Sequence, residues 1–300
     1  MTVAAVVVSY NRVDLLRKCL SALQDQDHIP DEIIVVDNGS SDGSQEVVRT
    51  EYPFVTLFET ERNLGGAGGF AWGVELAIKG GHSEAWLMDD DAEPHLDSLG
   101  VLVRAMSDAP DRPGFIASLV VNAAGEPSRQ HLPEVSQDPA RQLAATQLGG
   151  VATESASFVG VLVDLRRSKV TELPYSDFFI WFDDAEYTRR LAASSYGVLM
   201  PASRVFHPEK ENRSDMAGRL FYYLRNRIWL HRLDQTRVKT VRSWILLVWG
   251  LVSLSHEQLG HSQSGRLWAA CVYRGFRDGI FKTPAVTMPG DLIASLRVRG

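Results

Sequence analysis

The sequence has 300 residues, which is enough chain for one large domain with an appendage or for two small domains. Hydrophobic residues make up 45% and charged residues 23% of the chain, and this globular composition excludes a disordered or fibrous protein. The two cysteines, Cys19 and Cys271, are too few and too far apart for a disulfide framework or a thiolate metal site, and they fit a reducing compartment. Met1 precedes an apolar stretch without a basic region or a small-residue cleavage site, so we expect no signal peptide.

Charge is divided unevenly along the chain. Residues 216–300 contain 13 Lys and Arg residues against 4 Asp and Glu residues, whereas residues 1–215 contain 18 against 33. A basic C-terminal region indicates contact with an anion, such as a phospholipid surface, a lipid pyrophosphate or nucleic acid. Attraction between the two parts explains the pattern equally well. We therefore predict a body at 1–215 and a basic helical region at 216–300, which serves acceptor contact, membrane contact or oligomerisation.

The first half of the chain alternates apolar runs with helical patterns. The runs at 3–8, 32–37, 55–58 and 85–88 predict buried strands. Leucines at helical spacing behind Asp14, taken as the N-cap, predict a helix after the first strand, and further helices are expected from Gln45 and over 70–79. This order predicts an α/β fold with an open, mostly parallel sheet and helices on both faces.

The remaining chain is less regular. Residues 123–155 are expected to form a long loop, and strand character returns at 157–163. Beyond residue 216 the pattern predicts basic helices around 216–233, 238–256 and 262–280.

Polar clusters follow four of the predicted strands, where such sheets bind ligands: residues 9–12, 37–38, 62–63 and 89–91. The last cluster is an aspartate triplet. Strand alternation would place Asp89 and Asp91 on one face, where they repel each other unless a cation lies between them. Mg²⁺ or Mn²⁺ meets that need and leaves positions for phosphate oxygens. An acidic cap for a helix near Pro94 is the simpler alternative, but one aspartate would suffice for it.

Residues 63–69 read Asn-Leu-Gly-Gly-Ala-Gly-Gly, a run that lets a ligand approach the backbone closely. The run lacks the Gly-Lys-Ser/Thr of a Walker loop, and no GxGxxG pattern follows the first strand. A tight turn and close helix packing account for at least Gly68 and Gly69.

A second acidic motif precedes a predicted helix. Asp183 would cap this helix, Asp184 would favour its dipole, and Glu186 would pair with Arg190. Alternatively, one of the two aspartates beside Trp181 acts as a general base. The residues alone leave both interpretations open.

His207 follows another apolar run. A lone histidine is usually no ligand, although a carboxylate site that lacks a ligand would favour it.

Residues 244–252 are uniformly apolar but too short to cross a bilayer, which needs about 20 residues. Two tryptophans lie within this segment, and six basic residues precede it: Arg225, Arg227, Arg232, Arg237, Lys239 and Arg242. Such a helix fits the membrane interface, a buried core or a dimer contact. Nucleic acid is not expected, because no exposed aromatic platform accompanies the charges.

Taken together, four motifs resemble family 2 glycosyltransferases of the GT-A fold: Val-Val-Val-Ser-Tyr-Asn-Arg at 6–12, Ile-Val-Val-Asp-Asn-Gly-Ser-Ser-Asp at 34–42, the triplet at 89–91 and Phe-Asp-Asp-Ala-Glu at 182–186. The resemblance covers roughly residues 1–210. Within the family, residues 62–70 and 181–186 are most similar to bacterial galactofuranosyltransferases that start or extend cell-wall galactan. Rhamnosyltransferases that act on lipid-linked intermediates share much of the pattern.

The resemblance implies inverting transfer from a nucleotide sugar. It implies a donor site formed by Ser9, Arg12, Asp37, Asn63, Gly65, Gly66 and Asp90, with Asp37 at the uridine. It implies Asp89, Asp91 and His207 as ligands of Mn²⁺ or Mg²⁺. Asp184 matches the catalytic base, and the acceptor site is expected to include Trp181 and Asp183.

We therefore expect a galactofuranosyltransferase that uses UDP-galactofuranose on a polyprenyl-pyrophosphate-linked glycan. It would act as a peripheral protein at the cytoplasmic, anionic face of the cell membrane, with no nucleic-acid partner. One alternative is a rhamnosyltransferase that uses dTDP-rhamnose, and another is a non-catalytic protein that binds sugar nucleotides on the same fold. The sequence does not decide whether the protein is a homo-oligomer.

Overall fold

The N-terminal part of the chain builds the parallel half of a nine-stranded sheet. The computed structural model describes residues 1–168, 172–209, 215–235 and 238–299. The parallel strands are β1 (Val3–Ser9), β2 (Glu32–Asp37), β3 (Thr56–Glu59) and β4 (Glu84–Asp89). They lie in the order β3-β2-β1-β4, so that β1 pairs with both β2 and β4. Because β1 is covered on both faces, its seven residues are all buried, as its continuous apolar run predicts.

The second half of the sheet is mixed. β8 (Val159–Asp164) runs antiparallel to both β4 and β6 (Phe115–Val121), while β9 (Gly197–Phe206) runs parallel to β6. Two short strands, β5 (Glu93–Pro94) and β7 (Val151–Thr153), each pair antiparallel with β9. The predicted open α/β sheet is confirmed, and its second half is mixed rather than parallel.

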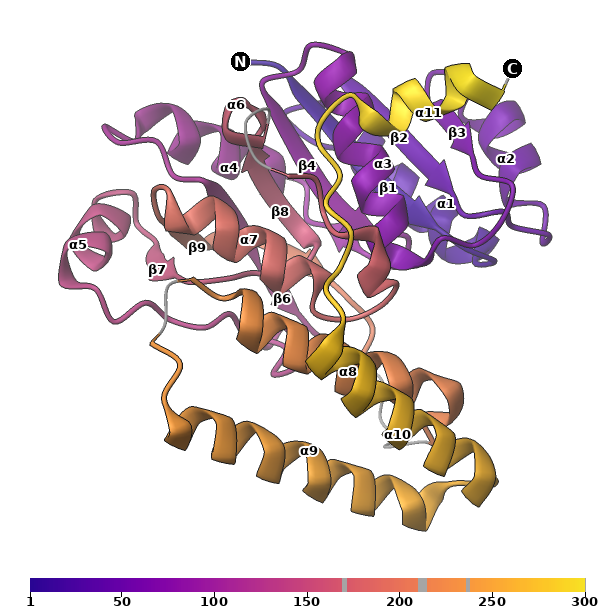
Figure 1. Ribbon diagram of the computed structural model, residues 1–300. Coiled ribbons are helices and arrows are strands. Elements are labelled where there is room, and N and C mark those ends of the chain that lie inside the picture. The colour runs from indigo at the N-terminus through magenta and orange to yellow at the C-terminus, as the bar shows by residue number, and fades with distance from the viewer. Residues whose placement is uncertain (169–171, 210–214, 236–237, 300) are drawn as a thin grey trace.

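Helices cover both faces of the sheet (Figure 1). On one face Val3, Ala5 and Val7 pack with α1 (Val13–Gln24), α2 (Ser44–Glu51) and α4 (Ser98–Asp108). On the other face Ala4, Val6 and Val8 pack with α3 (Gly65–Lys79) and α7 (Asp183–Ala193). Successive side chains of β1 thus alternate between two apolar cores, as the pleat of a strand requires.

Several predicted boundaries were wrong for local reasons. Arg12, not Asp14, is the N-cap of α1, and the carboxylate of Asp42 accepts the Val13 amide at 2.9 Å from a distant loop. No helix starts at Pro94, which lies in β5, and α4 begins at Ser98, so a helix cap does not explain the aspartate triplet.

The segment 123–155 holds more structure than expected. It contains β7 and α5 (Pro139–Gln147), a helix whose first amides are capped by the side chain of Asp138. The run of glycines after Asn63 is helical rather than a turn before a helix, since α3 begins at Gly65.

The C-terminal region is helical, as predicted. It consists of α8 (Leu220–Leu233), α9 (Val241–His261) and α10 (Gly265–Phe281), followed by α11 (Asp291–Arg299), which the sequence did not predict. Gly275 and Gly279 of α10 contact Leu224 and Ile228 of α8, because no Cβ keeps the helices apart.

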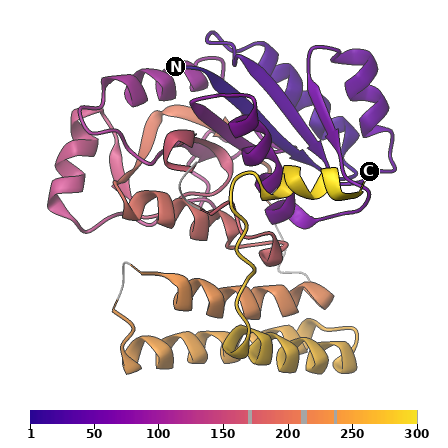
Figure 2. The same cartoon turned by 45° about the horizontal axis from the view of Figure 1, so that its top comes forward.

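These helices form a layer below the sheet, and the last segment of the chain returns to it (Figure 2). There the buried carboxylate of Glu75 in α3 accepts the Gly290 amide just before α11, at 2.7 and 2.8 Å. The shorter elements are α6 (Leu165–Ser168) and the 3₁₀ turns η1 (Ser176–Phe178) and η2 (Ala217–Arg219). In the part of the chain that the structure describes, no helix combines the length and the apolar character that crossing a membrane requires.

Candidate active site

A cavity of about 760 Å³ opens where β1 and β4 end. This is the edge at which the sequence predicts ligand binding, because the carboxyl ends of parallel strands meet there. Its walls include residues from both parts of the chain: Ser9, Arg12, Asn63, Gly65, Gly66, Asp89, Asp90, Asp91, Trp181, Asp183, Asp184, His207, Met216, Arg219, Leu254 and Gln258. With the exception of Asp37, every residue predicted for the site lines this cavity.

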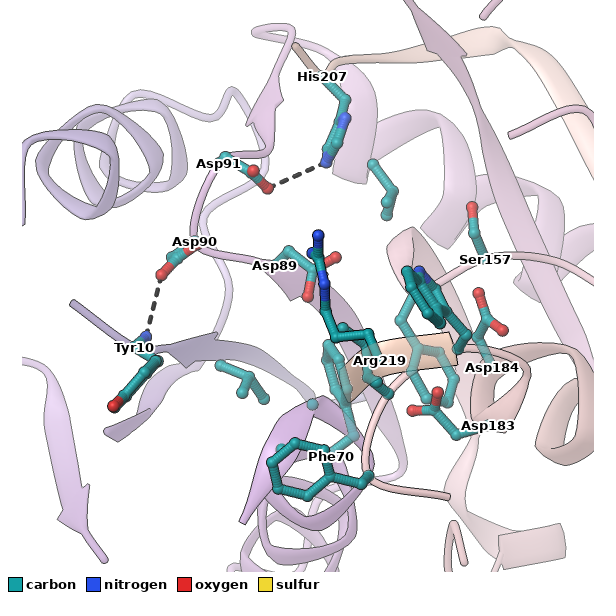
Figure 3. Close-up of a pocket in the computed structure, with 18 of the residues that line it drawn as sticks. Tyr10, Phe70, Asp89, Asp90, Asp91, Ser157, Asp183, Asp184, His207 and Arg219 are labelled. Atoms are coloured by element: carbon teal, nitrogen blue, oxygen red, sulfur yellow. Dashed lines mark hydrogen bonds and ion pairs between the residues drawn. The ribbon is translucent and has the colours of Figure 1, made fainter. Parts of the chain in front are cut away.

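Asp89, Asp91 and His207 lie together on one side of the cavity (Figure 3). Each offers one ligand atom, and these atoms lie within 4.8 Å of one another. The reason is not strand alternation, because β4 ends at Asp89 and a turn carries the next two aspartates. His207 directly follows the end of β9, and its Nε2 lies 3.0 Å from Oδ1 of Asp91.

The charges of this group fit a divalent cation. Burial, followed by the charges of Asp91 and Asp90, raises the pKa of Asp89 well above its ordinary value. Burial also opposes ionisation of Asp91, but His207 and Arg12 bring the pKa of Asp91 below its ordinary value. Ionisation of Asp89 is costly beside the ionised Asp91. A positive charge between the two carboxylates would lower that cost. Two carboxylates and an imidazole are ligands that Mn²⁺ accepts and that leave positions for phosphate.

Asp90 has a different environment from its two neighbours. Its Oδ2 accepts the Ser9 hydroxyl at 3.0 Å and the Tyr10 amide at 3.1 Å (Figure 3). Nη1 of Arg12 lies 3.2 Å from Oδ1 of Asp90 and 2.6 Å from Oδ2 of Asp91. The loop after β1 is therefore fixed to the aspartate triplet by ion pairs and hydrogen bonds.

The glycine run forms a second wall. Gly65 has φ +74°, and a Cβ there would overlap with the carbonyl oxygen of Phe179. Its amide donates to Oδ1 of Asn63 at 2.7 Å, and its carbonyl accepts Nδ2 of Asn38 at 3.1 Å. Gly66 has open space where a Cβ would point, so the backbone there is accessible from the cavity.

Gly68 and Gly69 serve packing instead. A Cβ at Gly69 would overlap with Val8, and one at Gly68 with Leu64. The predicted close helix packing is confirmed at Gly69, which faces β1, whereas Gly68 contacts the N-cap of its own helix. The tight turn predicted for these two positions was wrong, because both lie within α3.

Asp37 is separated from the other predicted donor-site residues. It is buried at the end of β2, outside the cavity lining, and its Oδ2 accepts the Ser40 amide and the side chain of Gln45. No hydrogen bond reaches its Oδ1 from the residues that the structure describes. Its neighbour Asn38 lines the cavity in its place.

Asp183 and Asp184 lie across the cavity from the aspartate triplet (Figure 3). They begin α7, whose N-cap is Phe182 rather than the predicted Asp183. Burial raises the pKa of both carboxyls, and the charge of Asp184 raises the pKa of Asp183 further. Oδ1 of Asp184 accepts the Ala185 amide at 2.7 Å, which holds that carboxylate at the first turn of the helix.

The remaining part of the second acidic motif has a structural role. Nε of Arg190 lies 2.7 Å from Oε1 of the buried Glu186, as predicted from their spacing. Trp181 lines the cavity beside the two aspartates.

Sequence reasoning missed several residues of the site. The ring of His131 packs at a tilt of 60° against the ring of His207, with centroids 4.6 Å apart. Burial, with the nearby His207, lowers the pKa of His131 to about 4. Arg219, Leu254 and Gln258 come from the C-terminal region and line the cavity. In the sequence, only the basic character of the C-terminal region indicated a role in binding, and it did not identify these three residues.

Open α/β sheets bind ligands at the carboxyl ends of their strands, and the carboxylates and histidine gathered there could hold a divalent ion that stabilises charge on a phosphoryl oxygen. The chain belongs to glycosyl transferase family 2, whose family model matches residues 4–165. The family expected from the sequence motifs is therefore confirmed.

Curated relatives include galactofuranosyltransferase GlfT1 of Mycolicibacterium smegmatis, which is 30% identical over 274 residues, covering 82% of this chain and 88% of that protein. Galactofuranosyltransferase GlfT1 of Mycobacterium tuberculosis H37Rv is 29% identical over 277 residues, covering 83% and 88%.

Solved structures show the same fold. Staphylococcus aureus TarS (1–349) in complex with UDP aligns with TM-score 0.58 at 12% identity, covering 84% of this chain and 71% of that chain. GalNAc-T7 with UDP, GalNAc and Mn²⁺ aligns with TM-score 0.58 at 14% identity, covering 94% and 55%. The chain spans 43% of another, longer TarS chain. These similarities show that the chain has the GT-A fold.

Proposed function

We propose that this protein is an inverting, metal-dependent galactofuranosyltransferase that uses UDP-galactofuranose. Its acceptor is a polyprenyl-pyrophosphate-linked glycan in cell-wall galactan synthesis. The observation that carries the proposal is the placement of a cation-binding group (Asp89, Asp91 and His207) opposite the carboxyls of Asp183 and Asp184 across one cavity. The similarity to GlfT1 along most of both chains supports the choice of sugar.

Asp89, Asp91 and His207 would hold Mn²⁺ or Mg²⁺. When bound, the ion neutralises the negative charge that develops on the departing diphosphate.

Asp184 acts as the general base. Its carboxylate accepts the proton of an acceptor hydroxyl while that oxygen forms a bond to the anomeric carbon of the donor. The bond between this carbon and the phosphate oxygen breaks, and UDP leaves with the bonding electrons. Because Asp184 lies across the cavity from the cation-binding group, attack and departure occur on opposite faces of the sugar, which inverts the anomeric centre. A raised pKa suits this role, since a base works best near the operating pH.

The donor is held by the loops after β1 and β3. Ser9, Arg12 and Asp90 form one connected group in the wall of the cavity. The other donor contacts along the cavity are Asn63, Gly65 and Gly66. The accessible backbone of Gly66 supports this assignment, because a bulky side chain there would meet the ligand.

The acceptor enters between Trp181 and the helices of the C-terminal region. Asp183 and Trp181 line the cavity together with Met216, Leu254 and Gln258 of the C-terminal region. Apolar and amide side chains suit a glycan joined to a lipid, since they contact sugar faces and hydroxyl groups.

The outward face of α9 meets the anionic inner surface of the cell membrane. Ile245 and Trp249 on this face are 62% and 74% exposed, and Arg242 precedes them. The acids of the described helices α9 and α10 lie elsewhere, because Glu257 lines the cavity and Asp278 is buried. An apolar face with cations and no outward carboxylate complements an anionic lipid surface.

The donor is tested by thermal stabilisation with Mn²⁺ and either UDP or dTDP. Stabilisation by UDP together with transfer from UDP-galactofuranose is expected. Stabilisation by dTDP alone would make the protein a rhamnosyltransferase.

A further inference from the structure

Residues 176–182 comprise η1 and the connection to α7, and the connection has a conformation that L-amino acids disfavour. Phe179, Trp181 and Phe182 have φ angles of 63°, 67° and 69°. Non-glycine residues with positive φ persist only where the surrounding structure holds them. This loop carries Trp181 into the cavity and ends directly before Asp183 and Asp184. Its conformation therefore decides where the proposed base lies.

One side chain of α8 binds the carbonyl groups of this loop. Nδ2 of Asn226 donates to the carbonyl oxygens of Phe178 and Ile180, both at 2.8 Å, and of Trp181 at 3.1 Å. Asn226 is completely buried. Its own Oδ1 accepts Nε of Arg225 at 2.9 Å, so both ends of the amide are bonded.

Arg225, the residue before Asn226, also binds carbonyl groups of this loop. Its Nη2 donates to the carbonyl oxygens of Asp177 and Phe178. The guanidinium also lies 4.1 Å from the ring centroid of Trp229 on the same helix, which fixes its orientation.

The loop is held from the opposite direction by α3. The Ala67 amide donates to the Phe179 carbonyl at 3.3 Å, and Gly65 leaves the space that this carbonyl occupies. The rings of Phe179 and Tyr222 stack at 4.9 Å. The loop is thus held between a helix of the donor site and a helix of the C-terminal region.

We propose that Asn226 is a positioning residue for glycosyl transfer, which acts by fixing the loop that places Trp181 and the first turn of α7. The inference rests on the proposed function in one respect, the role of Asp184 as base. Asparagine suits the position because its amide donates two hydrogens to adjacent carbonyl groups. An aspartate would place a carboxylate oxygen against the same three carbonyl oxygens. Residue 226 lies well beyond the region that the family model matches, so the C-terminal region supports catalysis as well as acceptor contact.

The test compares Asn226→Asp and Asn226→Ser with a matched control, Leu224→Ala. Leu224 is equally buried in α8, but it packs against Gly275 of α10 rather than the loop. We expect both Asn226 variants to lower kcat by about 100-fold, the scale of a misplaced catalytic group. Their affinity for UDP with Mn²⁺ should change by less than about twofold, because Asn226 bonds to none of the proposed donor-site residues. Leu224→Ala should lower the melting temperature at least as much and keep most of kcat.

Equal kcat losses in the Asn226 variants and in Leu224→Ala, at equal losses of melting temperature, would overturn the proposal. If Asn226→Asp does not fold, Asn226→Ser retains one donor and serves alone. Hydrogen exchange over residues 176–186 provides a readout that needs no activity. Faster exchange there in the Asn226 variants, but not in Leu224→Ala, supports the positioning role even if wild type transfers neither sugar. Unchanged hydrogen exchange in the Asn226 variants overturns the positioning role. Failure of the proposed function is a separate result, because it is seen only as absence of transfer by the wild-type protein.

Discussion

His207 Nε2 lies 3.0 Å from Asp91 Oδ1, although the two residues follow different strands. The short antiparallel ladder of β5 and β9 explains the contact, because it pairs Glu93 with Phe206, the residue before His207. A two-residue strand therefore brings the histidine to the aspartate triplet.

Changing His207 to Ala should weaken Mn²⁺ binding. The imidazole is one of three ligand atoms that converge, and loss of a group that holds a metal lowers affinity by about tenfold or more. We expect the stabilisation by UDP and Mn²⁺ to require correspondingly more Mn²⁺ in a thermal-shift titration. His256→Ala removes an exposed histidine of α9 and serves as the control. An unaltered Mn²⁺ dependence in His207→Ala would exclude this residue as a ligand.

Changing Asp184 to Asn should abolish transfer and preserve binding. General-base catalysis contributes about 10²–10⁴-fold, so kcat should fall by that factor, while UDP and Mn²⁺ still bind. Product formation measured by chromatography tests the first expectation, and calorimetry tests the second. A variant as active as wild type would remove the base assignment. Absence of transfer by wild type with either donor sugar, despite nucleotide binding, would favour the non-catalytic alternative.

When the pH is lowered, the activity should be lost at a higher pH than it would be if the base were an ordinary carboxyl. Asp184 works as a base only when ionised, and burial raises its pKa above the usual value of about 3.9. The rate constant kcat/KM should therefore fall with decreasing pH as the raised pKa is passed. A profile of kcat/KM from about pH 3 to about pH 9, a range that includes the ordinary carboxyl value of about 3.9, tests this. A midpoint near that ordinary value would contradict the expectation.

The buried carboxyl of Asp183 should reduce stability at high pH. Burial raises its pKa in the folded state, so the folded protein binds this proton more tightly than the unfolded chain does. Its stabilising contribution is complete below the unfolded value of about 3.9 and is lost as the pH rises through the raised folded value. The melting temperature of Asp183→Asn should therefore increase relative to wild type as the pH rises. A constant difference would show that this carboxyl is not perturbed.

Much of the sheet could be predicted because burial on both faces leaves a direct mark on the sequence. β1 reads as a continuous apolar run, and its polar end lies where parallel strands gather ligands. The aspartate triplet was identified for its chemistry rather than its geometry. Alternation fails at Asp89, where the strand ends, and the carboxylates converge because the following turn redirects Asp91.

The contribution of the C-terminal helices could not be predicted, because it depends on contacts between segments far apart in the chain. Arg219 and Gln258 reach the cavity only once α8 and α9 pack together. The same is true of Asn226, whose side-chain amide donates to carbonyl groups more than 40 residues earlier. α11 was not predicted because its position depends on contacts with distant segments, namely the Glu75 carboxylate and the apolar core on which Leu292 and Ile293 pack.

Gly65→Ala should destabilise the fold, whereas Gly66→Ala should not. A methyl group at position 65 would overlap with the Phe179 carbonyl, and the alanine would have to adopt a positive φ. Such strain costs about 1–3 kcal/mol in the free energy of unfolding. Gly66 has open space instead, so Gly66→Ala should keep its stability and lose UDP affinity. Urea denaturation and calorimetry measure the two effects, and equal unfolding free energies of the two variants would refute the clash.

Membrane contact should depend on Trp249 rather than on Trp244, the other tryptophan of α9. Trp249 is 74% exposed, whereas Trp244 packs into the cluster formed with α8 and α10. Burying one such side chain in lipid contributes about 1.5–3 kcal/mol, so Trp249→Ser should lower binding to anionic vesicles by at least about tenfold.

Arg242→Gln should remove about 1 kcal/mol of this attraction, and the loss should disappear at high salt. Sedimentation with vesicles of anionic or zwitterionic lipid measures both effects. Trp244→Ser is unsuitable as a test, because it disturbs the helical cluster itself. If Trp249→Ser binds vesicles as wild type does, while its sedimentation coefficient shifts from oligomer to monomer, the outward face of α9 contacts another copy of the chain rather than lipid.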